Sequence, residues 1–139
     1  MVKKPLKIVL DTNVLVFALI YGGKPEQTYN LILEKQITAV TSVILLAELT
    51  ETLIKKFKFD LRKIEQLERI IKKHFKIVHP DKTINIVKDE PDNRVLEAAI
   101  EGDCEYIVTG DNDLLSLGEY RNIKIITADQ FLMIQNMSI

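Results

Sequence analysis

Hydrophobic and polar residues follow two different periods along the chain. Short apolar runs that are typical of buried strands occupy residues 6–10, 37–42, 76–78, 106–110 and 123–127. Helices are predicted over residues 14–20, 25–35, 43–57, 61–75, from Asn93 to Gly102, and 128–134, with a turn and a short helix at 111–118. Strands that alternate with helices predict an α/β fold, a three-layer α/β/α sandwich around a central, mainly parallel sheet.

Local signals support several of these helix boundaries. Ser42 and Asp60 are residue types that cap helix N-termini, and each precedes a helical segment. Gly22-Gly23 marks a turn over residues 21–27, before a helix with Pro25 in its first turn. The helix after Asp60 has apolar residues at helical spacing, which predicts one core-facing side made of Leu61, Ile64, Leu67, Ile71 and Phe75.

Length and composition place the chain among soluble globular proteins. A length of 139 residues suggests a single domain over residues 1–139, and 47% hydrophobic with 28% charged residues is enough for a packed core. No apolar run is long enough for a membrane span, and the N-terminus lacks a secretory pattern. The single Cys104 excludes a disulfide framework within the chain. Together these features predict a cytoplasmic protein without a membrane partner.

The net charge of −1 hides two segments of opposite sign. Residues 55–76 carry nine Lys or Arg and three acids, whereas residues 81–113 carry ten acids and three bases. One face can therefore attract a polyanion while another attracts cations. A solvated helix face beside ordinary acidic loops gives the same distribution, so the charge blocks alone do not decide the function.

The acids that matter most lie where strands end. Asp11 interrupts an apolar stretch directly after the strand at 6–10, and Asp111 follows the strand at 106–110. Asp92 stands at the start of a helix, and Glu48 lies one or two turns into the helix 43–57. Ligands of open parallel sheets bind outside the carboxyl ends of the strands, so these carboxylates are expected to share one crevice.

Carboxylates brought together require either raised pKa values or a cation between them. An oxygen-only ligand set suits Mg²⁺ or Mn²⁺. Cys104, His74 and His79 lack the spacing of zinc ligands, and the Gly-Gly-Lys at 22–24 lacks the pattern of a phosphate-binding loop. An acidic metal site beside a basic surface indicates phosphoryl chemistry on a nucleic acid.

Each of these residues also has a purely structural interpretation. Asp92 can simply cap its helix, and Asp111 and Asp113 can form a turn. Glu48 can be an ordinary surface residue. Lys24, in the loop after the first strand and helix, can contact phosphate or only water.

Four segments together resemble the PIN domain family of metal-dependent ribonucleases. They are "VLDTNVLV" (9–16), "TSVILLAELTETL" (41–53), "DEPDNRVLEAA" (89–99) and "YIVTGDNDLL" (106–115). The chain is most similar to the small single-domain members described as toxins of toxin–antitoxin pairs. The resemblance implies a three-layer α/β/α fold and an Mg²⁺- or Mn²⁺-dependent nuclease that acts on RNA.

The resemblance also assigns roles to individual residues. It makes Asp11, Glu48, Asp92 and Asp111 the acidic quartet. Asp11, Asp92 and Asp111 would hold the metal with Asp113 as a further ligand, and Asn13 or Thr12 would be an auxiliary polar group. The chain reads "DEPDN" where the family often has a Pro-Asp-Asp run, so Asp89 or Glu90 can compete with Asp92. Contacts to RNA phosphates are expected from Lys24, Lys55, Lys56 and Lys58.

Partners and alternatives follow from the same comparison. The resemblance implies an RNA substrate, an antitoxin protein and a homodimer, to which the apolar C-terminal segment 131–139 can contribute. A non-catalytic module that binds RNA or protein is the main alternative. A receiver-like phosphoacceptor domain also gathers acids around Mg²⁺, but it needs a Lys at the end of a late strand, where this chain has Thr127.

Overall fold

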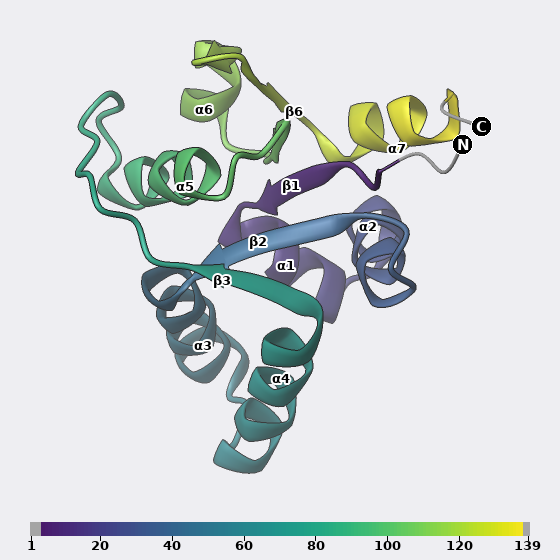
Figure 1. Ribbon diagram of the computed structural model, residues 1–139. Coiled ribbons are helices and arrows are strands. Elements are labelled where there is room, and N and C mark those ends of the chain that lie inside the picture. Colours follow the sequence, from purple (N-terminus) through teal and green to yellow (C-terminus); the bar gives the residue numbers. More distant parts are fainter. Residues whose placement is uncertain (1–3, 138–139) are drawn as a thin grey trace.

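The computed structural model of the protein describes residues 4–137 and contains one six-stranded sheet (Figure 1). The strands are β1 (Lys7–Leu10), β2 (Thr38–Ser42), β3 (Phe75–Val78), β4 (Tyr106–Val108), β5 (Glu119–Tyr120) and β6 (Ile123–Ile126). Their order in the sheet is β3-β2-β1-β4-β6-β5, and only β5 runs antiparallel to its neighbour. The predicted parallel α/β fold is confirmed, although the short strand β5 was not predicted.

Helices cover both faces of this sheet (Figure 1). They are α1 (Thr12–Ile20), α2 (Gly23–Leu33), α3 (Val43–Phe57), α4 (Leu61–His74), α5 (Glu90–Glu101), α6 (Asn112–Leu117) and α7 (Ala128–Met137). Helices α1 to α4 lie on one face, and α5 and α6 lie on the other. None of the helices within residues 4–137 is long and apolar enough to cross a membrane.

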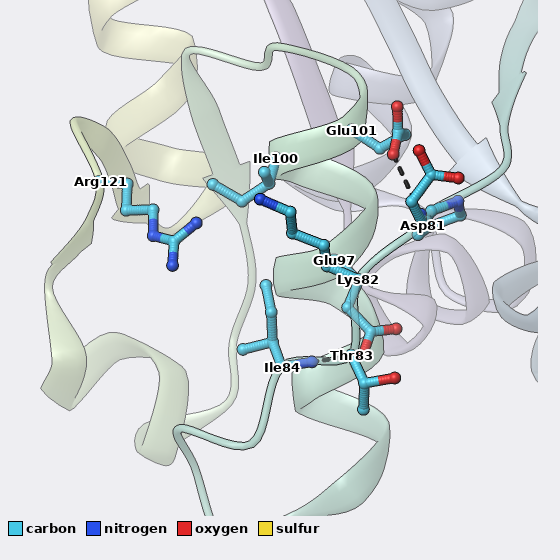
Figure 2. A pocket seen from close by; sticks show the side chains of 9 residues that line it. Asp81, Lys82, Thr83, Ile84, Glu97, Ile100, Glu101 and Arg121 are labelled. Carbon is cyan, nitrogen blue, oxygen red and sulfur yellow. Dashed lines mark hydrogen bonds between the residues drawn. The ribbon is translucent and has the colours of Figure 1, made fainter.

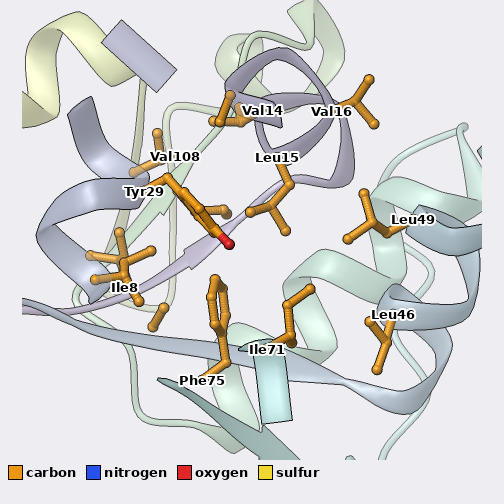
Figure 3. Packing of buried hydrophobic residues seen from close by; sticks show 14 of the residues in the cluster. Ile8, Val14, Leu15, Val16, Tyr29, Leu46, Leu49, Ile71, Phe75 and Val108 are labelled. Atoms are coloured by element: carbon orange, nitrogen blue, oxygen red, sulfur yellow. The ribbon is translucent and has the colours of Figure 1, made fainter. Parts of the chain in front are cut away.

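Alternating side chains of the central strands belong to two separate hydrophobic cores. Ile8 and Leu10 of β1 belong to the larger core, which is shared with α1 to α4 (Figure 3), whereas Val9 belongs to the smaller core under α5 and α6. A strand buried on both faces reads as a continuous apolar run, which is how β1 appears in the sequence. In the larger core, the rings of Tyr29 and Phe75 lie 6.4 Å apart.

The structure confirms both predicted helix caps. The Ser42 hydroxyl accepts a hydrogen bond from the Leu45 N–H at 3.3 Å, and α3 has the predicted bounds. The Asp60 carboxylate likewise accepts from the Lys63 N–H at 2.9 Å, at the start of α4.

The prediction that Leu61 lies in the core is wrong. Leu61 is 73% exposed, whereas the other predicted core positions of this segment, Ile64, Leu67, Ile71 and Phe75, are buried. Helix α4 runs toward β3, so its first turn lies farthest from the sheet (Figure 1). Apolar spacing therefore identifies the correct helix face but not how far along the helix the core extends.

Other boundaries shift by a few residues. Helix α1 begins at Thr12, directly after β1, and α2 begins before Pro25. In the C-terminal segment, Phe131 and Leu132 are buried and Met133 is exposed, while residues 138–139 lie outside the described residues. The first part of this apolar segment therefore lies in the core.

The strand order changes direction between β1 and β4. From β1 the chain first builds outward through β2 and β3, and it then returns to place β4 on the other side of β1. The two strands are parallel neighbours, and the Asp11 N–H donates to the Val108 carbonyl at 2.9 Å. Such a switch point opens a crevice at the carboxyl ends of the strands.

Helix α5 packs closely against β2 through Gly102. A Cβ atom at Gly102 would lie 2.7 Å from one methyl carbon of the buried Val40 and 2.9 Å from the other. Gly102 has a φ of −84°, so the need for glycine is steric rather than conformational. This close approach sets the C-terminal end of α5 against β2.

We predict that Gly102→Ala destabilises the fold by about 1–3 kcal/mol, because the added methyl group overpacks a stiff site. Gly110→Ala is the matched control, since among the described residues no heavy atom lies within 4 Å of a Cβ there. Urea unfolding of both variants measures the difference. Equal midpoints for the two variants would contradict the steric explanation.

Candidate functional site

Thr109 connects the ends of β1 and β4. Its hydroxyl donates to Asp11 Oδ2 at 2.7 Å and accepts from the Asp111 N–H at 3.0 Å. Its own N–H donates to the Ile126 carbonyl of β6 at 2.9 Å. One buried side chain therefore fixes the position of Asp11 relative to Asp111. The sequence interpretation missed Thr109, although its place two residues before Asp111 at a strand end was a usable signal.

Asp111 has a structural role as well as a place in the site. Its Oδ1 accepts hydrogen bonds from the Asp113 N–H at 2.8 Å and the Leu114 N–H at 3.2 Å, and so caps α6. The turn-forming interpretation and the functional one therefore both apply to this residue. Asp113 is exposed in the first turn of α6.

A cluster of acidic groups lies at the start of α5. Oxygen atoms of Asp89, Asp92 and Asp111 all lie within 4.8 Å of one another. Asp92 is only 4% exposed, and its Oδ2 has no hydrogen-bond partner among the described residues. Asp89 is the N-cap residue of α5, yet its side chain makes no capping hydrogen bond within the described part of the chain. Asp89 therefore joins Asp92 rather than replacing it.

Asn93 fixes the segment that carries Asp89. Its Oδ1 accepts from the Ile86 N–H at 2.9 Å and the Val87 N–H at 3.0 Å, while its amide donates to the Val87 carbonyl at 2.8 Å. Farther along α5, Glu97 accepts from the Ile84 N–H at 2.8 Å and pairs with Arg94 at 2.9 Å. These polar side chains hold the loop before α5 and were not predicted from the sequence.

Burial and repulsion raise the pKa values of two acids in this site. Burial is the largest cause for Asp92, and repulsion by Asp111 and a hydrogen bond to it act in the same direction, so the pKa of Asp92 rises to about 8. Burial also raises the pKa of Asp11, against the lowering effect of the Thr109 hydrogen bond. Repulsion from Glu48 and Asp111 adds to the rise for Asp11. Near neutral pH the site is therefore stabilised by binding a proton or a cation.

The donor set fits a hard divalent cation. Asp89, Asp92 and Asp111 offer only oxygen atoms, and the buried Oδ2 of Asp92 has no positive partner among the described residues. The predicted ligand Asp11 lies outside this set of three, although it is near enough to raise the pKa of Asp92. Oxygen ligands of this kind suit Mg²⁺ or Mn²⁺. The hydroxyl of Thr12, beside Asp11, is also buried without a hydrogen-bond partner in residues 4–137.

The remaining predicted residues lie at different distances from this cluster. Glu48 is half-buried on α3 and close enough to Asp11 to raise its pKa. Lys55, Lys56 and Lys58 lie at the other end of α3, about two to three turns away from Glu48 along the helix. Lys55 is paired with Glu51 at 2.6 Å.

A pocket of about 440 Å³ opens directly beside Asp111. The predicted residues Asn13 and Lys24 line it, and Asn13 is exposed. The other residues that line it are Val14, Phe17, Pro25, Thr109, Gly110, Thr127, Ala128 and Asp129. Its walls come from α1, α2, the loop after β4 and the start of α7. The pocket and the acidic cluster thus share Asp111.

A smaller pocket of about 210 Å³ shares no residue with the acidic cluster. Figure 2 shows this pocket from close by. The loop before α5 and the outer side of α5 form it, and Arg121 extends toward it from the β5–β6 turn. The Asp81 N–H donates to Glu101 there at 3.2 Å. None of the predicted site residues lines this pocket.

Comparisons with known proteins agree with this architecture. A model of the PIN domain family matches residues 7–113. The uncharacterised protein MJ1680 of Methanocaldococcus jannaschii is 33% identical over 131 residues, covering 90% of this chain and 84% of that protein.

Two solved structures share the fold. The crystal structure of VapBC2 from Rickettsia felis bound to a DNA fragment from its promoter has a TM-score of 0.61 at 18% identity and covers 86% of this chain and 97% of that one. PAE2754 from Pyrobaculum aerophilum has a TM-score of 0.61 at 14% identity and covers 96% and 91%. These structures support the fold alone, whereas the family model spans most of the chain, and the protein therefore belongs to the PIN domain family.

Proposed function

We propose that the protein is an Mg²⁺- or Mn²⁺-dependent endoribonuclease that hydrolyses phosphodiester bonds of RNA. The observation that carries this proposal is the buried, unpartnered oxygen of Asp92, which lies among the carboxylates of Asp89 and Asp111 at the switch point of the sheet. Membership of the PIN domain family, whose members are generally nucleases, supports it. A module that only binds RNA does not need acids to be gathered around a buried carboxylate such as that of Asp92.

The acids take different roles in this proposal. Asp89, Asp92 and Asp111 would hold the metal, and Asp11, which lies near enough to raise the pKa of Asp92, would add a further carboxylate. Thr109 keeps Asp11 in position through its 2.7 Å hydrogen bond. Glu48, half-buried near Asp11, orients water. When bound, the metal lowers the pKa of water and neutralises charge on the leaving oxygen. Asp11, Glu48 and Asp113 are not part of the cluster found among the described residues, so Asp11 and Asp113 stay predicted ligands.

Contacts with RNA phosphates are assigned to the lysines. Lys24 is the best placed, because it lines the pocket beside Asp111. Lys55, Lys56 and Lys58, farther along α3, would bind more distant phosphates. Such contacts add affinity without selecting a base sequence.

The proposal extends to a toxin–antitoxin role. One of the solved structures with the same fold is VapBC2 of Rickettsia felis, bound to promoter DNA. This neighbour and the sequence resemblance support an antitoxin protein as the partner of this chain. The homodimer stays a prediction from the resemblance, as does the cytoplasmic location.

We predict that Asp11→Asn abolishes Mn²⁺-dependent cleavage of single-stranded RNA, because the buried amide cannot replace a charged ligand. Incubation with a panel of RNAs, followed by mapping of the product ends, measures the effect. The wild-type protein should leave 5′-phosphate and 3′-hydroxyl ends.

The exposed acid Asp81, which lies away from the cluster, provides the control for this experiment. Asp81→Asn should cleave like the wild-type protein. Full activity of folded Asp11→Asn would overturn the site assignment. A wild-type protein that shifts RNA in a gel but never cuts it would favour the binding module instead.

We predict that the metal-free protein loses stability as the pH rises from about 5 to about 8. The pKa of Asp92 is raised to about 8, so the folded protein binds this proton more tightly than the unfolded chain does. The free energy of unfolding therefore falls as pH rises through this window. Thermal unfolding in EDTA should show the fall, and Asp92→Asn should reduce it.

Added Mn²⁺ should raise the unfolding midpoint more at pH 8 than at pH 5, because the ligands must lose their protons to bind it. Asp81→Asn should keep the wild-type slope. A midpoint that does not change with pH in EDTA would show that Asp92 is not held as described.

We predict that Asp89→Asn weakens Mn²⁺ binding about tenfold or more, the size typical for the loss of a supporting ligand. Isothermal titration calorimetry on the folded variants measures this affinity. The neighbouring Glu90→Gln is the matched control, because Glu90 is exposed and pairs with Arg94 at 3.4 Å instead of joining the cluster. Equal affinities of the two variants would exclude Asp89 as a ligand.

A further inference from the structure

We propose that the pocket beside Asp111 binds one base of a single-stranded RNA, from a nucleotide next to the phosphate that is cleaved. This inference rests on the proposed nuclease function and names a subsite for its substrate. The pocket shares Asp111 and Thr109 with the acidic site. A phosphate bound to a cation that these carboxylates would hold places the base of an adjoining nucleotide at the mouth of this pocket.

The size of the pocket suits a single flat ring with its sugar. Its volume of about 440 Å³ lies toward the lower end of the range for small-molecule sites, roughly 300–1,000 Å³. The loop at Gly110 leaves this space open, because among the described residues no heavy atom lies within 4 Å of a Cβ built there. The pocket is thus a shaped space next to the site and does not depend on any further opening of the loop.

The lining of the pocket suits an aromatic ring. Phe17 of α1 is 52% exposed, which is unusual for a large aromatic side chain. Its ring lies 5.2 Å from that of Tyr21, so Phe17 is supported from one side while it lines the pocket. Val14, Pro25 and Ala128 add apolar surface. Aromatic side chains of this kind are the usual stacking platforms for bases of single-stranded nucleic acids.

The charges of the lining favour a neutral base over a phosphate inside the pocket. Lys24 is the cationic side chain of the lining, and Asp129 and Asp111 are the anionic ones. Asp129 repels a phosphate but can accept a hydrogen bond from an amino or imino N–H of a base. Lys24 is then available for the phosphate that links this nucleotide to the next. The occupant that fits all three charges is a nucleotide whose base points inward.

The test uses a short single-stranded RNA that the wild-type protein cuts at one mapped bond. Two further RNAs lack the base on one or the other side of that bond. One of these abasic substrates should lose about tenfold or more in kcat/KM, which is the size expected when a base loses its stacking partner. The other abasic substrate should be cut nearly as well as the intact RNA.

Substitutions of Phe17 assign that loss to the pocket. Phe17→Leu keeps the bulk but removes the ring, so it should lower kcat/KM on the intact RNA and make the protein insensitive to the missing base. Phe17→Tyr keeps the ring and should behave like the wild type. Both variants should bind Mn²⁺ with wild-type affinity, because Phe17 is not in the acidic cluster. Met133→Ala, an exposed apolar side chain outside the pocket lining, is the control for general surface effects.

A second variant tests the pocket without touching Phe17. Gly110 lines the pocket, and a Cβ there meets no described heavy atom within 4 Å at a φ that any residue adopts, so Gly110→Leu should narrow the pocket and still fold. Its cleavage of the intact RNA should fall to the level of the abasic substrate, with Mn²⁺ affinity unchanged.

The outcomes separate this inference from the proposed function. A wild-type protein that cuts no RNA overturns both. A wild-type protein that cuts RNA but tolerates the loss of either base overturns only the subsite. If the abasic penalty persists in Phe17→Leu and Gly110→Leu, the base binds elsewhere, the pocket serves another occupant such as a protein side chain, and the inference is wrong.

Discussion

The junction between β1 and β4 is the constraint on which the site depends. The two strands are parallel neighbours, the Asp11 N–H bonds to the Val108 carbonyl, and the Thr109 hydroxyl bonds to the Asp11 carboxylate. These contacts bring together residues that lie about a hundred positions apart in the chain. Because the strand order reverses here, no helix connection blocks the crevice, and the carboxylates can meet at its edge.

The cost of this arrangement is electrostatic. Burial and mutual repulsion raise the pKa values of Asp11 and Asp92. The metal-free fold therefore contains carboxylates whose charged forms would be more stable in water. The surrounding structure offsets this cost with ordinary packing. Gly102 brings α5 close to β2, and Asn93 fixes the loop that carries Asp89. A fold that tolerates such strain at one edge of its sheet is typical of a site kept for function rather than stability.

Strand ends and helix periods could be predicted because they depend on local patterns. The apolar runs before Asp11 and Asp111 located both acids, and Ser42 and Asp60 marked helix starts that the structure confirms. Leu61 shows the limit of this approach, since its spacing matches the core face while the helix end lies beyond the core. Spacing along one element cannot report where the neighbouring element stops.

The parts of the site that escaped prediction depend on contacts between distant segments. Thr109 is one of several threonines at strand ends, and its hydrogen bonds with Asp11 and Asp111 distinguish it. Asn93 reads as an ordinary residue near a helix start, because its partners are backbone groups of a loop without regular structure. Asp89 was expected only as a competitor of Asp92, since its place beside both Asp92 and Asp111 depends on a carboxylate from the loop after β4. The pocket beside Asp111 has walls from four separate segments, so no single motif encodes it.

The two sides of Asp111 have opposite chemical character, and this asymmetry has a direct consequence for an RNA chain. On one side lie the carboxylates of Asp89 and the buried Asp92, which attract a cation, and on the other side lie Phe17 and apolar neighbours. A nucleotide has the same division, with a charged phosphate at one end and a flat, neutral base at the other. A free phosphate or a bare hydrophobic ligand would match only one of the two sides. A single-stranded nucleotide matches both, whereas a base paired within a duplex cannot turn into the pocket without leaving its stack. If the pocket binds a base as we propose, the same geometry that gathers the acids would favour single-stranded over double-stranded RNA.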